Sequence, residues 1–363
     1  MAKPKKTSFG EEFEPILLSA WGSIKEHMDE ALIDKTRRAV SEIRRYYRFK
    51  NVYPSKIRYS IPRNRAGYLA AFGQCHAYLS YIHLKRLQNV APSEIPRPNS
   101  RELVVTILGA GAALEAYGLC LFYCEESFKI RKLNLNVVEK VKEWQSTRNT
   151  VLNRWIKVKF PKLDISTVDI DADLAKDDCI QKLSYHYDQV VMTDILIIYN
   201  VLNEIEVRNA TKVWRNLDFI LKICDKRLLV LLMEPCAPKA RARVDWLIKA
   251  LAQHSRVIDV RYDEEIRLDS PPTEVAFEGT GIGLNDRLFS RVVGGSNPAL
   301  QTSIRRTNLA CIMDPRSPIS QEEMQKQLKQ VDIKRGKKGR FAPSAKRSEG
   351  EQLSMPLDTP FIA

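Results

Sequence analysis

From residue 100 onward, short apolar runs of strand length alternate with segments whose apolar residues recur at helical spacing. This alternation predicts β-α-β units, whose right-handed crossovers give a parallel sheet covered by helices on both faces. The runs are ELVVTILGAG (102–111), LNLNVVEK (133–140), LDISTVDI (163–170), DILIIYNVL (194–202), RLLVLLMEP (227–235) and RVIDVRYD (256–263). Two later runs, RLFSRVVGG (287–295) and RTNLACIMDP (306–315), have no helix between them, so an antiparallel pair is expected. The pattern therefore predicts an α/β fold with a doubly wound, mostly parallel sheet.

Before residue 100 the apolar spacing is helical, and the segment APSEIPRPNS (91–100), with three prolines, is typical of a linker. Beyond Pro318 the chain is rich in Lys, Gly, Ser and Pro, a composition that cannot bury enough apolar surface to fold. We therefore predict a helical basic N-terminal region (1–98), an α/β domain (99–318) and a disordered basic C-terminal tail (319–363).

A glycine-containing turn follows the first strand, where Gly109, Ala110 and Gly111 lead into a helix. In an open parallel sheet, ligands bind at the carboxyl ends of the strands, and the first strand-to-helix turn is the usual contact. Gly109 suits a tight turn, and Gly111 would let a ligand approach the backbone. Glycines at such turns also serve packing alone, so this motif by itself is weak.

Acidic residues end the next two strands. Glu139 lies where the ribose hydroxyls of a nucleoside would be, and a carboxylate can accept two hydrogen bonds from them. Asp169 follows as a candidate partner for the amino group of the base. Each acid also fits a solvated residue at the start of a helix, where the helix dipole stabilises negative charge. The two alternatives remain open at this point.

Together these features resemble the class I S-adenosylmethionine-dependent methyltransferases. Within that superfamily the chain is most similar to the ribosomal small-subunit methyltransferase-like proteins, through RAGYLAAFGQCHAYL (65–79), NVLNEI (200–205) and MEPCAPKARARVDWLIKAL (233–251). The resemblance implies a seven-stranded sheet, S-adenosyl-L-methionine as cofactor, and Gly109, Ala110, Gly111, Glu139 and Asp169 as its binding residues. The chain departs from the pattern at Ile107, where an acid is usual, and at Ala113, where a third glycine is common.

Candidates for the reacting end of the cleft follow the fourth strand, namely Tyr199, Asn200 and Glu204. In amino-methylating relatives an Asn or Asp followed by Pro-Pro-Tyr holds the target amine, but here Val201 and Leu202 follow Asn200. Methyl transfer from a sulfonium can proceed by positioning alone, so we assign no catalytic residue. The cysteines are scattered without metal-ligand spacing, and no metal is expected.

The formal charge of +14 predicts a polyanionic partner. Lys35 to Arg65 contains eleven Lys or Arg against one acid, interleaved with tyrosines, and Lys326 to Arg347 contains nine against one. Tyrosine beside arginine offers stacking as well as charge, which favours RNA or a ribosomal particle over a merely solvated surface. Without a signal peptide or a long apolar span, the chain is expected to be cytoplasmic.

Three functional hypotheses follow from these residues. The first is a methyltransferase acting on ribosomal or otherwise structured RNA, and the second is a non-catalytic methyltransferase-like RNA-binding or ribosome-assembly module. The third, a nicotinamide-dependent oxidoreductase, is weaker because the dinucleotide motif needs another glycine at the helix entry, where this chain has Leu114.

Overall fold

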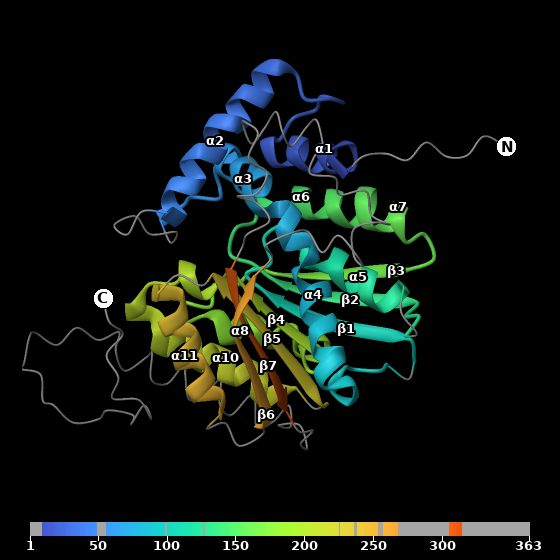
Figure 1. The fold of residues 1–363 in the computed structure, drawn as a ribbon, viewed down its shortest axis with the longest axis vertical. Helices are drawn as coiled ribbons and strands as arrows, with labels where there is room; N and C mark the ends of the chain where they lie inside the picture. The colour runs from blue at the N-terminus through green and yellow to red at the C-terminus, as the bar shows by residue number, and fades with distance from the viewer. Residues whose placement is uncertain are drawn as a thin grey trace, which may run out of the picture.

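The computed structural model describes residues 9–48, 56–98, 100–125, 128–224, 226–235, 238–252, 257–267 and 305–313. Its centre is a sheet with strand order β3-β2-β1-β4-β5-β7-β6 (Figure 1). The strands are β1 (Glu102–Leu108), β2 (Lys132–Val138), β3 (Asp164–Ile170), β4 (Ile195–Tyr199), β5 (Leu228–Pro235), β6 (Val257–Arg267) and β7 (Arg305–Met313).

Most neighbouring strands of the sheet run parallel. Strands β1 to β5 pair in parallel, whereas β7 lies antiparallel between β5 and β6. The mostly parallel α/β sheet predicted from the apolar runs is confirmed. The expected strand at 287–295 and the tail from 319 lie outside the described residues. Because the strand order reverses between β1 and β4, this point is where a ligand crevice is expected.

Helices cover both faces of the sheet. One face carries α4 (Gln74–Val90), α5 (Glu115–Glu125), α6 (Trp144–Thr150) and α7 (Lys157–Lys159). The other carries α8 (Cys179–Ser184), α9 (Tyr187–Val190), α10 (Ala210–Ile223) and α11 (Pro238–Ala252). Successive residues of β4 alternate between the two resulting cores: Ile195 and Ile197 pack with the first group, Leu196 and Ile198 with the second. Strands buried on both faces must be apolar throughout, which is why their runs are continuous.

The N-terminal region shares the core of the sheet and has none of its own. It comprises α1 (Phe9–Trp21), α2 (Glu30–Arg48), α3 (Pro62–Tyr68) and α4, and its buried side chains form one cluster with β1, β2 and β4. Phe13 of α1 packs edge-to-face on Trp155 at 5.7 Å between ring centroids. The linker predicted at 91–100 joins α4 to β1, but the apolar core continues across that boundary.

None of the helices in the described ranges has the length and apolar character needed to cross a membrane.

Candidate functional site

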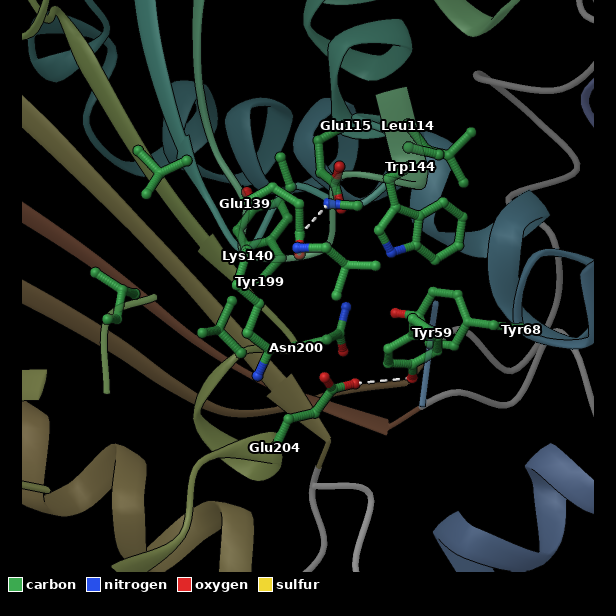
Figure 2. Close-up of a pocket in the computed structure, with 18 of the residues that line it drawn as sticks. Tyr59, Tyr68, Leu114, Glu115, Glu139, Lys140, Trp144, Tyr199, Asn200 and Glu204 are labelled. Carbon is green, nitrogen blue, oxygen red and sulfur yellow. Dashed lines mark hydrogen bonds between the residues drawn. The ribbon is translucent and has the colours of Figure 1, made fainter. Parts of the chain in front are cut away.

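A cavity opens at the carboxyl ends of β1, β2 and β4, where the strand order reverses (Figure 2). It encloses about 850 Å³, open solvent at its mouth included. Its floor is the turn after β1, and its sides are the residues that follow β2, β3 and β4. Residues from α3, α4 and the segment before α3 complete the wall, so the N-terminal region contributes directly to the site.

The turn after β1 is held in a conformation that favours glycine. Gly109 has φ +62° and Gly111 has φ +49°, both in the left-handed region that side chains disfavour. A Cβ added to Gly109 would lie 2.7 Å from Cγ2 of Val201, so this turn packs tightly on the loop after β4. Ala113 also has a positive φ, 54°, which a third glycine would adopt without strain. The backbone at Ala113 therefore has the conformation that a glycine favours, and only the residue type departs from the pattern.

Glu139 joins this turn to the end of β2. Its Oε2 accepts a hydrogen bond from the backbone N–H of Gly111 at 2.8 Å, and Oε1 accepts one from Val141 at 2.8 Å (Figure 2). Burial raises the pKa of Glu139, and the two backbone donors act in the opposite direction. Each carboxylate oxygen keeps a second lone-pair site for a ligand hydroxyl. The structure thus brings together Gly109, Ala110, Gly111 and Glu139 in one cavity, as the sequence pattern predicts.

Asp169 differs from its predicted role. Instead of lining the cavity, it forms an ion pair with Arg148 at 2.6 Å and accepts a hydrogen bond from Gln145. Arg148, only 3% exposed, also donates to the carbonyl oxygen of Gly111 at 2.6 Å. Asp169 therefore supports the glycine turn from behind through Arg148. The acid after β3 that does line the cavity is Asp173, which lies beyond the strand end.

All three cleft candidates after β4 line the cavity. Asn200 has φ +57°, a conformation that asparagine tolerates better than most residues, and its Nδ2 lies 3.2 Å from Nε2 of His76. Tyr199 places its hydroxyl 3.1 Å from Nδ1 of His83, and burial raises the pKa of Tyr199 well above its ordinary value.

The loop after these residues is fixed from outside the cavity. Glu234 accepts a hydrogen bond from the backbone N–H of Leu202 at 2.7 Å, and Arg243 donates to the carbonyl of the same residue at 2.5 Å. Both side chains are buried, and neither lines the cavity. Glu234 and Arg243 therefore hold the loop in position without contacting a ligand.

An aromatic wall closes the side of the cavity formed by the N-terminal region. Tyr59, Tyr68 and Trp144 pack with centroid distances of 5.2 to 6.3 Å, and Figure 2 shows them facing the strand ends. The Tyr59 hydroxyl donates to Oε1 of Glu204 at 3.0 Å, and Tyr68 lies 3.2 Å from Nδ1 of His76. Neither His76 nor Tyr59 is marked as a cavity residue by the pattern of its neighbours in the sequence. Their approach to the strand ends depends on long-range packing, which no local pattern signals.

Glu115, the first residue of α5, is a further cavity residue that sequence reasoning missed. Its side chain is 7% exposed, and within the described part of the chain its Oε2 has no hydrogen-bond partner. Burial raises the pKa of Glu115 to about 7. The only signal in the sequence was its place six residues after Gly109, at the entry of the first helix of the α/β domain.

The cavity contrasts in charge with the molecule as a whole. Carboxyl groups line it on several sides, while the one lysine among the described lining residues, Lys140, is exposed. The carboxyls belong to Glu115, Glu139, Asp173 and Glu204. Although the chain carries +14 overall, this space favours a cationic or hydrogen-bond-donating ligand. No group of three His, Cys, Asp or Glu suited to a metal ion occurs among the residues described.

The basic stretch Lys35 to Arg65 is only partly a surface. Arg65 is buried and donates to the carbonyl oxygens of Tyr59 and Ser60, so it serves the fold. Tyr59 is buried at the cavity, and Tyr46 packs partly against the core, so neither side chain is fully exposed. Where the structure describes the side chains of this stretch, the exposed cations are Lys35, Arg37, Arg38, Arg45, Lys56 and Arg58. The second basic stretch, Lys326 to Arg347, lies outside the described residues.

No protein-family model and no curated protein matches this chain. Among solved structures it is similar to the plantazolicin methyltransferase BpumL in complex with SAH, at 11% identity and a TM-score of 0.37, over 84% of this chain and 98% of that one. It is also similar to a putative class I S-adenosylmethionine-dependent methyltransferase from Listeria monocytogenes, with 8% identity, a TM-score of 0.40, and coverage of 89% and 98%. A third similar structure is a 16S rRNA (adenine(1408)-N(1))-methyltransferase from Catenulisporales acidiphilia with cosubstrate SAM, at 15% identity, a TM-score of 0.33, and coverage of 60% and 89%. Likenesses this distant say nothing about the ligand of this chain, whose chemistry has to come from its own cavity.

Proposed function

We propose that the chain is an S-adenosylmethionine-dependent methyltransferase. The observation that carries this proposal is the Glu139 carboxylate, fixed beside the Gly109–Gly111 turn and facing a cavity at the point where the strand order reverses. Two neighbouring strand ends thus offer a hydroxyl-binding acid and a side-chain-free backbone, which together suit a nucleoside. The carboxyl groups that line the cavity also suit a cationic nucleoside.

The groups of the cavity fit such a cofactor. Glu139 would hold the ribose hydroxyls, and the backbone of Gly109 to Gly111 would lie along the nucleoside. Two buried acceptors, Oε2 of Glu115 and Oδ1 of Asn200, lack partners within the described residues and suit the donors of an amino acid moiety. When bound, S-adenosylmethionine supplies an electrophilic methyl group on a sulfonium. The chain itself would orient the acceptor with Asn200 and Glu204 and exclude water with the aromatic wall.

Calorimetry with S-adenosylhomocysteine and with NAD tests this assignment. Micromolar affinity for the first and none for the second is the expected result. Preference for NAD would instead support the oxidoreductase. Binding of neither ligand would support the non-catalytic module, in which the backbone hydrogen bonds of Glu139 would serve the turn alone.

For the methyl acceptor we propose ribosomal or otherwise structured RNA. The support is the set of exposed cations on α2 and before α3, where Lys56 and Arg58 closely precede Tyr59 of the cavity wall. A nucleobase presented from a loop, or flipped out of a helix, would enter the carboxylate-lined cavity while its phosphates stayed on the basic surface. The stretch Lys326 to Arg347 is proposed as a second RNA contact on charge alone.

The double substitution Arg38→Gln and Arg45→Gln is expected to weaken binding to small-subunit ribosomal RNA and to reduce the salt dependence of the affinity. Two lost phosphate contacts should lower the slope of log K against log salt by about 1 to 2. Filter binding over a salt series measures this slope.

The matched control is Lys222→Gln with Lys249→Gln, two exposed lysines on α10 and α11, which cover the face of the sheet away from α4 and α5. Equal slopes for both double variants would remove α2 from the RNA-binding surface.

A further inference from the structure

The cavity contains a carboxyl group that the ribose-binding assignment does not use. Glu115 is buried at the start of α5, and its Oε2 lacks a partner among the described residues. An ionised carboxylate in such a place is costly unless a ligand compensates it. Because this oxygen lines the cavity, we expect a ligand to supply the hydrogen-bond donor that the described residues do not.

The position of Glu115 says which part of a ligand it would meet. Glu139 follows β2, whereas Glu115 follows β1 and acts electrostatically on Tyr199 of β4, two strands away from β2 in the sheet order. Glu139 therefore marks the β2 side of the cavity, and Glu115 follows the central strand β1, which lies between β2 and β4. Figure 2 draws Glu115, Tyr199 and Asn200 among the walls of the same space.

We propose that Glu115 binds the amino group of the methionine moiety of the cofactor, an inference that rests on the proposed function, and so replaces the acid absent at Ile107. Ile107 is 1% exposed and packs in the apolar cluster on the face of the sheet that carries α4 and α5. Glu115 provides the negative charge eight residues later, on the same side of the sheet.

The amino group is the part of the cofactor that fits this acceptor best. The cofactor carries two positive groups, the sulfonium and the ammonium, but only the ammonium has N–H donors for an orphan oxygen. Oδ1 of Asn200, buried without a partner among the described residues, is a second acceptor in the same cavity. The N-terminus of α5 adds a favourable dipole for the ionised carboxylate.

The test compares two ligands on two variants by calorimetry. The ligands are S-adenosylhomocysteine and 5′-methylthioadenosine, which has the nucleoside but lacks the amino acid part. Glu115→Gln should weaken binding of S-adenosylhomocysteine about tenfold or more, and binding of 5′-methylthioadenosine less than twofold. The control Asp171→Asn changes an exposed acid outside the cavity lining and should alter neither affinity.

Urea denaturation separates a binding role from a structural one. Because a neutral amide at this position would remove an uncompensated buried acid, we expect Glu115→Gln to unfold at an equal or higher urea concentration than the unsubstituted chain. Reduced stability, or equal losses of affinity for both ligands, would overturn the role of Glu115. Failure of the unsubstituted chain to bind either ligand would instead overturn the proposed function.

A pH series gives an independent readout. The pKa of Glu115, raised to about 7 by burial, means that a proton competes with the ligand ammonium below that pH. Affinity for S-adenosylhomocysteine should therefore fall as the pH is lowered through about 7 in the unsubstituted chain, and less so in Glu115→Gln. The other titratable groups at or next to the cavity, among the described residues, are His76, His83, Tyr59, Tyr68, Tyr199, Glu139, Lys140, Asp173 and Glu204. An identical fall in Glu115→Gln would assign the effect to one of them and overturn the proposal.

Discussion

Replacing Glu139 by alanine should weaken the binding of S-adenosylhomocysteine by about tenfold to a hundredfold. Hydrogen bonds to a charged acceptor contribute about 1.5 to 3 kcal/mol, and each 1.4 kcal/mol changes affinity tenfold. The substitution also removes the acceptor for the N–H groups of Gly111 and Val141, so the glycine turn loses its attachment to the end of β2. Calorimetric titration of the folded variant measures the loss.

The control for this experiment is Asp171→Ala, since Asp171 is also an acid after a strand but forms an exposed ion pair with Lys142. It should leave the affinity unchanged. If Glu139→Ala bound S-adenosylhomocysteine as well as the unsubstituted chain, the ribose assignment would be wrong and the carboxylate would serve only the turn.

Asp169→Ala is expected to lower the free energy of unfolding by about 3 kcal/mol, because it leaves a buried cation without its counter-charge. The guanidinium of Arg148 would retain the carbonyl oxygen of Gly111 but lose its ion pair, while its Nε is already buried without a partner in the described structure. Urea denaturation followed by circular dichroism measures the change.

Asp171→Ala again provides the comparison, since an exposed pair contributes about 1 kcal/mol or less. The structural role of Asp169 and its predicted contact with the base of the cofactor lead to different expectations for the stability and the ligand affinity of Asp169→Ala. If Asp169 contacted the base of the cofactor, Asp169→Ala would lose affinity for S-adenosylhomocysteine with little loss of stability, and that outcome would contradict the ion-pair interpretation.

The predicted site residues that line the cavity are connected through neighbouring strands. Gly109, Gly111 and Glu139 all lie at the ends of adjacent parallel strands, and parallel pairing brings such ends to one edge of the sheet. The prediction for Asp169 used the same rule, but the acid that lines the cavity is Asp173, four residues later in the chain. Asp169 is still within β3, and it meets Arg148, a residue that nothing in the local pattern marks as buried.

The N-terminal region shows a second limit of local patterns. Three prolines between residues 91 and 100 predict a linker, and a linker suggests separate domains. In the structure the helices before it pack onto β1 and β4 and place Tyr59, Tyr68 and His76 on the cavity wall. Which apolar faces meet across the chain depends on shape and packing over long sequence separations, which composition does not encode.

The sequence by itself determined the class of the fold and the place of the cavity, because alternating apolar runs specify buried parallel strands whose carboxyl ends must meet. Only the tertiary structure decided which polar groups face that cavity and which are enclosed behind it. Glu115 and Asp169 are both acids near strand ends. Oε2 of Glu115 is buried at the ligand space without a partner among the described residues, whereas Asp169 is paired with Arg148. Burial and partners are properties of the whole packed chain, and they separate a binding group from a structural one.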